Sequence, residues 1–335
     1  MKRRVLCIAA AIITVLSLSN CSEGSHFPTL SGPYLGQQPP GTTPEIFAPG
    51  VISTGFRENA AAFTPGGTEF FFGLVGSPYS VILQMRQDGD LWTKPEIIPV
   101  IGRYSNFDFT LSPDGNRLYF TSYRPRSGTG EPADKRSLWF IEREGLGWSD
   151  PKVIEFPSDD YEAVYPSIAA NGNLYFFLSE GGERDTDIYF SHPIGDGRYG
   201  EPIRLGNEIN SSYNDWDAYI APDESYMVFG SAERPDGFGG SDLYVSFRTD
   251  DGGWTEAINL GDEVNSGEYE ICPYVTADGS YLFYTSQRNL VDAFSEEPLT
   301  YEEKIRILRS PGSGFSNGDI YWVDAAVIEN LRPES

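Results

Sequence analysis

The chain alternates apolar and polar residues in short runs separated by turn-forming residues, and this pattern recurs five times. Residues 109–122 show it clearly, as a strand, an Asp114-Gly115 turn and a second strand. Asp and Gly tolerate the positive φ of a tight turn, so this sequence is a strong hairpin signal. Corresponding turns lie at landmarks spaced by 48, 57, 52 and 55 residues: Pro65, Pro113, Ala170, Pro222 and Ala277. The spacing predicts five repeated units.

Each unit contains two further strand candidates, which makes the repeat a four-stranded sheet. The third strand is a run of apolar and aromatic residues: 81–83, 138–141, 188–190, 243–245 and 320–323. An aspartate precedes it in three units and can accept hydrogen bonds from turn amides: Asp187, Asp242 and Asp319. An aromatic residue that we expect to pack between units precedes the fourth strand: Trp92, Trp148, Tyr199 and Trp254. Four-stranded units arranged radially make a β-propeller.

The fifth unit lacks a fourth strand of its own, because little chain remains after Val323. The missing piece has a counterpart at the other end, where residues 44–47 (Pro-Glu-Ile-Phe) resemble residues 95–98 (Pro-Glu-Ile-Ile). We expect the N-terminal strand to complete the last blade and close the ring. The prediction is an all-β propeller of five blades, with six as the alternative if the preceding segment hides a degenerate unit.

Composition agrees with an all-β fold and limits the function. The chain has 21 Phe, 20 Tyr and 6 Trp, together with 36 Gly and 24 Pro, which favours many short strands joined by turns. Its 49 acidic residues against 24 Lys and Arg give a net charge of −25. A nucleic-acid-binding protein needs a basic face to neutralise phosphates, so this function is excluded.

The first residues are typical of an export signal rather than of the folded domain. A basic start at residues 2–4 and a 14-residue apolar run to Leu18 predict a signal peptide over residues 1–20. Cys21 follows in a lipobox-like sequence, which predicts lipidation, although Asn20 departs from the usual small residue; a soluble secreted protein is the alternative. We expect residues 21–43 to form a flexible tether and residues 44–330 to form the propeller, lipid-anchored in the periplasm or on the outer membrane.

The repeat motifs resemble the WD40-like β-propeller repeat of TolB and of many exported bacterial proteins. The matching stretches cover nearly everything after residue 44, and the clearest are residues 111–115 (Leu-Ser-Pro-Asp-Gly), 118–122, 205–211 and 239–244. The resemblance implies an exported propeller that binds proteins or glycans, and it carries no shared catalytic motif. Gly66 and Asn171 replace the turn aspartate in two units.

Acidic residues recur just before the inner strand of several units and are the candidate site. Counting back eight residues from the turns gives Glu58, Asn106, Asp215 and Glu270, and counting back six gives Asp108 and Asp217. In the third unit the eighth position is Ala163, and Glu162 lies next to it. These seven polar residues are the predicted ligand-binding set. In a propeller these positions converge on one mouth of the central channel. Clustered carboxylates repel one another unless a cation neutralises them, so one interpretation is a polar-ligand or Ca²⁺ site; the other is a ring that binds water and backbone amides.

Three functional hypotheses therefore remain open. The first is a protein-interaction scaffold in the cell envelope, a monomer that binds an envelope protein. The second is a carbohydrate- or cation-binding module that uses the mouth carboxylates. The third is a glycoside hydrolase with Asp108, Asp217 and Glu270 as candidate acid, base or modulator, because such enzymes need two carboxylates at a defined separation. An enzyme is the less favoured interpretation, and no cofactor other than Ca²⁺ is predicted.

The remaining cysteine, three arginines and an insertion in the fifth unit are interpreted as structural features. Once Cys7 and Cys21 are assigned to the signal and the anchor, Cys272 is alone in an apolar strand, which favours a small buried residue. Arginines after the second strand are expected to stabilise loops: Arg124, Arg234 and Arg288. The fifth unit has a long insertion between residues 290 and 318, in which Thr300 and Glu303 form a capping box ahead of a short predicted helix.

Overall fold

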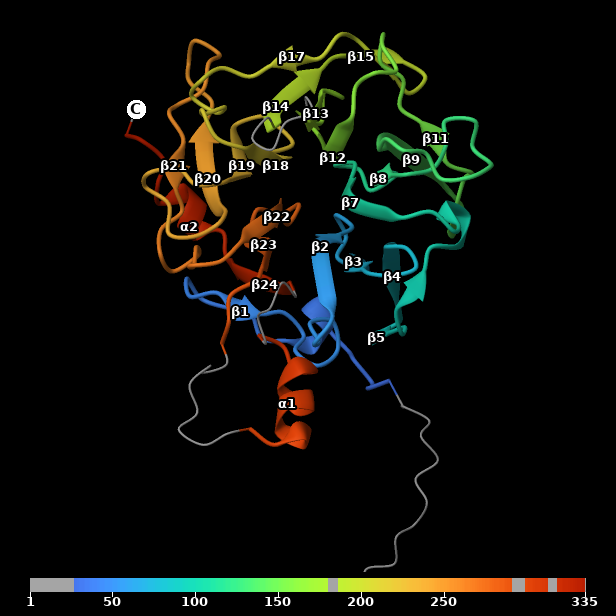
Figure 1. Ribbon diagram of the computed structural model, residues 1–335, viewed down its shortest axis with the longest axis vertical. Helices are drawn as coiled ribbons and strands as arrows, with labels where there is room; N and C mark the ends of the chain where they lie inside the picture. The colour runs from blue at the N-terminus through green and yellow to red at the C-terminus, as the bar shows by residue number, and fades with distance from the viewer. Residues whose placement is uncertain (1–26, 180–185, 291–298, 313–317, 335) are drawn as a thin grey trace, which may run out of the picture.

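The computed structural model describes residues 27–179, 186–290, 299–312 and 318–334, which form a ring of five β-sheets (Figure 1). Each sheet is an antiparallel meander, and the five blades are arranged around a central axis, whose inner lining we call the channel. The predicted all-β, five-blade propeller is confirmed, and the six-blade alternative is wrong. The predicted signal peptide and Cys21 lie outside the described residues.

The blades have closely similar strand orders from the channel outward. Blade 1 contains β2 (Arg57–Phe63), β3 (Glu69–Val75), β4 (Val81–Asp88), β5 (Leu91–Trp92) and β6 (Glu96–Ile97). Blade 2 contains β7 (Asn106–Leu111), β8 (Arg117–Ser122), β9 (Ser137–Glu144), β10 (Gly147–Trp148) and β11 (Lys152–Val153). Blade 3 contains β12 (Ala163–Ile168), β13 (Leu174–Ser179), β14 (Thr186–Ser191) and β17 (Ile203–Arg204), with the hairpin β15 (Pro193–Gly195) and β16 (Arg198–Tyr199).

The last two blades complete the ring. Blade 4 contains β18 (Asp215–Ile220), β19 (Tyr226–Ser231), β20 (Asp242–Phe247) and β21 (Ile258–Asn259). Blade 5 contains β22 (Glu270–Val275), β23 (Tyr281–Ser286), β24 (Asp319–Asp324) and β1 (Glu45–Ile46). We call the end of the channel at which the inner strands begin the mouth. The base is the opposite end, where the tight turns join each inner strand to its neighbour.

The ring is closed by the N-terminal strand, as the sequence predicts. Strand β1 pairs with β24, with Ile46 opposite Tyr321, and the Phe47 amide donates to the Ile320 carbonyl at 2.7 Å. The Phe47 ring is fully buried and makes edge contacts with Phe283 and Trp322 at centroid distances of 5.1 and 5.2 Å. The first described strand of the chain thus completes the blade built from its last strands.

The predicted flexible tether is wrong for residues 27–43, which pack on blades 1 and 5. The Trp92 amide donates to the Leu30 carbonyl at 2.9 Å, and its indole donates to the Gly32 carbonyl at 2.8 Å. The Tyr34 ring lies 5.1–5.3 Å from three aromatic rings of the two blades: Phe63, Tyr281 and Trp322. Burial of aromatic side chains orders this segment despite its content of Pro, Gly and Gln, so the packing includes residues 27–43 as well as the predicted propeller.

Aromatic residues before the fourth strands fill the seams, as expected. Trp148 of blade 2 makes an edge contact with Phe71 of blade 1, at a centroid distance of 6.1 Å, and its indole donates to Gln84 at 3.3 Å. Tyr199 of blade 3 is buried beside Phe156, with centroids 6.2 Å apart. These contacts make neighbouring blades mutually dependent.

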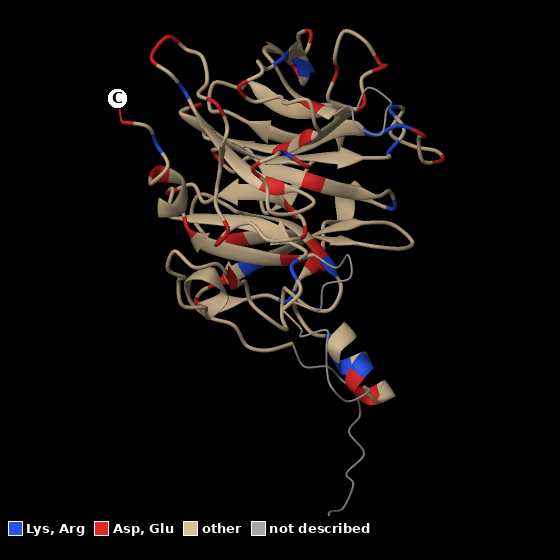
Figure 2. Ribbon diagram, turned by 60° about the vertical axis from the view of Figure 1, so that its left-hand side comes forward, with Lys and Arg blue, Asp and Glu red and all other residues tan. Residues whose placement is uncertain are grey.

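The insertion of blade 5 contains the predicted helix. Helix α1 (Tyr301–Leu308) begins with a complete capping box between Thr300 and Glu303. It projects away from the blades (Figure 2), and none of its side chains is buried. The other short helices are η1 (Pro33–Gly36), η2 (Pro99–Ile101) and α2 (Ala326–Glu329).

Candidate functional site at the channel mouth

Three of the predicted acidic residues cap the loops that enter the inner strands. Each carboxylate accepts hydrogen bonds from a Ser or Thr four residues earlier: Thr54 for Glu58, Ser211 for Asp215 and Ser266 for Glu270. All three acidic side chains are buried. Their oxygens are therefore occupied by the protein's own donors, as in the interpretation in which acids bind backbone amides.

The arginines that follow the second strands stabilise mouth loops, as the sequence predicts, and two of them contact a capping carboxylate. Arg234 donates to the Asp215 carboxylate at 2.7 Å, and Arg288 lies 3.6 Å from the Glu270 carboxylate. Asn106 takes the acidic position in blade 2, and there Arg124 donates to the Ile101 carbonyl at 2.6 Å instead. The arrangement stabilises each mouth loop separately.

A second ring of residues shares an unusual backbone conformation. In every inner strand one non-glycine residue has a φ between 46° and 55°: Ala60, Asp108, Tyr165, Asp217 and Cys272. The pairing register with the second strand shifts around each of them, which identifies a β-bulge. A non-glycine residue in this region costs about 1–2 kcal/mol, so the surrounding contacts must hold all five in place.

Contacts across the channel show that the bulge residues meet near its axis. The Tyr165 hydroxyl of blade 3 donates to the Pro273 carbonyl of blade 5 at 3.1 Å. The Cys272 amide and thiol donate to the same Asp217 oxygen, at 3.3 and 3.5 Å. Cys272 is buried, as predicted, and burial raises the pKa of its thiol well above the usual value.

Asp108 and Asp217 are the acidic pair that the structure brings together. Burial raises the pKa of Asp217 to about 6, against hydrogen bonds from Cys272 and the charge of Arg136, which lower it. Burial and then the negative charge of Asp217 raise the pKa of Asp108 well above its usual value, while Arg136 and Arg57 act in the opposite direction. The Asn59 amide donates to Asp108 at 3.3 Å. Holding two carboxylates here disfavours their simultaneous ionisation.

Glu162 is linked to this pair through Arg136, whose charge also acts on Asp108 and Asp217. Its carboxylate accepts a hydrogen bond from Arg136 at 2.5 Å. Among the described residues, no three His, Cys, Asp or Glu side chains form a group able to hold a metal ion. The carbohydrate, Ca²⁺ and hydrolase interpretations of Asp108, Asp217 and Glu270 stay predictions.

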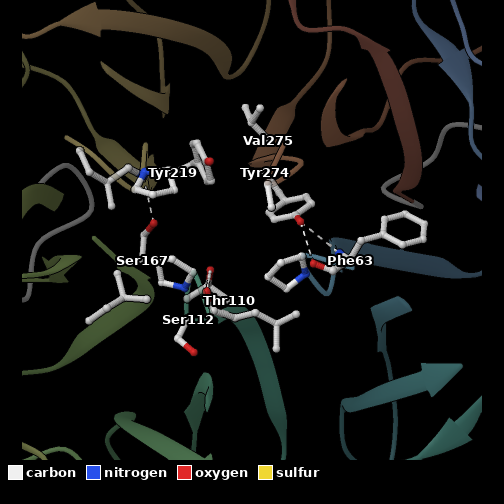
Figure 3. Close-up of a pocket in the computed structure, with 14 residues that line it drawn as sticks. Phe63, Thr110, Ser112, Ser167, Tyr219, Tyr274 and Val275 are labelled. Atoms are coloured by element: carbon white, nitrogen blue, oxygen red, sulfur yellow. Dashed lines mark hydrogen bonds between the residues drawn. The ribbon is translucent and has the colours of Figure 1, made fainter. Parts of the chain in front are cut away.

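Residues from all five blades line the base of the channel (Figure 3). The Tyr274 hydroxyl of blade 5 donates to the Phe63 carbonyl of blade 1 at 2.9 Å, and Ser167 accepts from the Ile220 amide at 3.0 Å. The cavity left among these residues measures about 40 Å³, room for no more than about three water molecules. A larger ligand therefore cannot enter the channel along its axis from the base.

The mouth loops also carry four exposed aromatic residues, which the sequence analysis missed. Five aromatic side chains in the described ranges are at least 36% exposed. Four of them belong to loops at the mouth: Phe56, Tyr79, Phe238 and Tyr269. The fifth, Tyr301, begins helix α1 of the blade 5 insertion. The large exposed side chains of the base turns are aliphatic: Leu91, Leu146 and Ile194. The sequence held one signal for this difference between mouth and base. Each of these mouth aromatics lies between the predicted strands of the repeat, where no alternation of apolar and polar residues predicts burial.

Within the described ranges, no helix is both long and apolar enough to cross a membrane. No protein-family model and no curated protein matches the sequence.

Several solved structures are similar to this chain. They include a putative TolB from Agrobacterium tumefaciens, with 16% identity over 80% of this chain and 90% of that chain and a TM-score of 0.47. TolB from Acinetobacter baumannii has 14% identity over 81% of this chain and 57% of that chain, with a TM-score of 0.46. An α-L-arabinofuranosidase from Lactobacillus brevis has 12% identity over 81% and 91% of the two chains, also at 0.46. At these identities the likeness concerns the fold alone, a five-blade β-propeller with TolB proteins among its structural neighbours.

Proposed function

We propose that this propeller is a protein-binding module of the cell envelope, which docks a partner on its mouth face. The observation that carries the proposal is that four of the five exposed aromatic side chains of the described residues lie on mouth loops: Phe56, Tyr79, Phe238 and Tyr269. Aromatic residues are enriched at the centres of protein interfaces because they bury large areas at a small entropic cost. The small cavity at the base and the internally satisfied carboxylates Glu58, Asp215 and Glu270 support a role for the outer surface of the mouth.

Export and lipid anchoring at Cys21 belong to the same proposal. The basic start and apolar run of residues 2–18 support export. Five residues separate Cys21 from Phe27, whose ring packs on the domain, and a chain of that length spans at most about 20 Å. A lipid at Cys21 would hold the propeller close to the membrane surface, in reach of envelope proteins.

Photo-crosslinking at single positions tests the docking face. Benzoylphenylalanine replaces Phe56, Tyr79, Phe238 or Tyr269 at the mouth, and Leu91, Leu146 or Ile194 at the base serve as matched exposed controls. We expect discrete cross-linked adducts from mouth positions in cells that export the protein, and none from base positions. Equal adduct formation from both faces, or none from the mouth, would contradict the proposal.

Metabolic labelling with a palmitate analogue tests the anchor. The wild-type chain is expected to incorporate the label and to sediment with membranes, whereas Cys21→Ala should lose both properties. Cys272→Ala is the matched control, since its thiol is buried in the channel and should leave labelling unchanged. An unlabelled wild-type protein in the soluble fraction would support the secreted alternative.

A further inference from the structure

Two neighbouring mouth loops form one rigid surface on blades 4 and 5. Residues 232–241 and 260–269 make up this surface, which we call the acidic-aromatic patch. The amides of Gly240 and Ser241 donate to the Glu268 carbonyl at 2.7 and 3.2 Å. A Cβ at Gly240 would lie 2.4 Å from the Tyr269 ring, so only glycine allows this approach without a shift of the ring. The close contact fixes the two loops against each other.

The backbone at Phe238 is also held by hydrogen bonds to a buried carboxylate. The buried Asp242 carboxylate accepts hydrogen bonds from the Phe238 amide at 2.6 Å and from the Gly239 amide at 3.2 Å. Phe238 remains 50% exposed and Tyr269 41% exposed. Two aromatic rings are thus held at the surface by a preorganised backbone, which reduces the entropy lost when a partner binds.

The charge around these rings is strongly negative. The patch contains one arginine, Arg234, and five exposed acidic residues: Glu233, Asp236, Asp262, Glu263 and Glu268. Arg234 does not offset the exposed acids, because its guanidinium is largely buried and paired with Asp215. No described cation forms an ion pair with Asp262, Glu263 or Glu268. The overall charge of −25 extends the same field beyond the patch.

Guanidinium and ammonium groups suit such a surface. A cation over an aromatic face gains about 0.5–1 kcal/mol at an exposed site, and a neighbouring carboxylate adds an ion pair. The protein uses the same combination internally: the Arg143 guanidinium lies 3.8 Å from the centroid of the Trp148 ring and pairs with Glu69. Among its described residues, the patch presents the aromatic and acidic half of this arrangement without an exposed cation.

We propose that the acidic-aromatic patch docks an arginine- and lysine-rich polypeptide segment of the partner. This inference rests on the proposed protein-binding function and names the chemistry of the partner. Arginine side chains stack on Phe238 and Tyr269 while their guanidinium groups pair with Asp262, Glu263 and Glu268. Arginine should be preferred to lysine, because its planar group combines stacking with bidentate hydrogen bonding.

The test measures binding of fluorescent decapeptides that alternate arginine, lysine or glutamate with glycine. Fluorescence anisotropy is recorded at 50 and 300 mM salt. The arginine peptide is expected to bind most tightly and to weaken at the higher salt, as screening requires. The triple variant Asp262→Asn, Glu263→Gln, Glu268→Gln should weaken its binding by about tenfold, and Phe238→Ser with Tyr269→Ser by about fivefold.

A matched triple variant removes three exposed acids on the base side instead: Asp196→Asn, Asp250→Asn and Glu256→Gln. It carries the same change in net charge, so a loss of no more than about twofold is expected. Equal losses in both triple variants would overturn the inference in favour of non-specific attraction, as would absence of arginine-peptide binding. Thermal unfolding confirms that each variant is folded.

The cross-linking experiment separates this inference from the proposed function. If mouth cross-links persist unchanged in the patch triple variant, the patch inference fails while the proposed function stands. If mouth cross-links are absent from the wild type, the proposed function itself fails.

Discussion

Replacing Asp215 by alanine is expected to lower the free energy of unfolding by about 3–5 kcal/mol, the range for breaking a buried ion pair. The Asp215 side chain is fully buried and accepts hydrogen bonds from Ser211, Ser231 and Arg234. Alanine leaves the Arg234 guanidinium, only 12% exposed, without its carboxylate and frees the loop that begins β18. Urea unfolding followed by tryptophan fluorescence measures the change.

Two further variants separate the charge from the hydrogen bonds. Asp215→Asn keeps an acceptor for the Ser211 amide and should lose less stability than Asp215→Ala. The double variant Asp215→Ala with Arg234→Met removes the unpaired cation and should recover part of the loss, because the uncompensated buried charge is the main penalty. A loss below about 1 kcal/mol for Asp215→Ala would show that water replaces the carboxylate at this position.

Asp217→Asn is expected to stabilise the protein at pH 8 and to change little at pH 4. The pKa of Asp217 rises from about 4 in the unfolded chain to about 6 in the folded protein, so the native state binds this proton more tightly. Stability from this group is therefore present at low pH and is lost as pH rises from about 4 through 6. A shift of this size corresponds to about 3 kcal/mol at pH 8.

Asparagine suits the position for two reasons. It imitates the neutral acid and keeps an oxygen for the Cys272 amide, and it tolerates the φ of 49° at Asp217. It also removes the charge that raises the pKa of Asp108. Unfolding free energies of both proteins are compared at pH 4 and pH 8, with Asp250→Asn as an exposed control. A destabilised Asp217→Asn protein at pH 8 would contradict the assignment of a disfavoured charge.

The repeat could be predicted because its signals are local. Asp114-Gly115 and its counterparts specify hairpins through positive-φ residues, and alternation of apolar residues specifies strands that are half buried. The likeness of residues 44–47 to residues 95–98 predicted the closing strand. Both segments form the outer strand that pairs with the third strand of a blade. The capping box of α1 was found for the same reason.

The candidate site could be predicted only in part. Counting along the repeat placed Asp108 and Asp217 correctly at the starts of inner strands, but it treated them as equivalent to Glu58 and Glu270. The bulges separate these groups, because one extra residue per strand turns Asp108 and Asp217 out of register with their neighbours. None of the five bulge residues with a positive φ is a glycine. The positions of the bulges could therefore not be predicted from the strand pattern.

The packing of residues 27–43 was missed for a related reason. Their composition is that of a linker, yet Tyr34 enters a pocket of rings contributed by two blades that are distant in sequence. Likewise, Phe238 and Tyr269 lie 31 positions apart, and only the contact of two mouth loops makes them one surface.

By itself, the sequence determined the number of blades, their strand order and the strand that closes the ring, because turn chemistry and side-chain alternation act over a few residues. The tertiary structure decided which acids cap loops, which two acids meet in the channel and which aromatic rings share the mouth. These outcomes depend on how strands from separate blades converge around an axis, and that convergence is set by burial and by contacts between residues far apart in the chain.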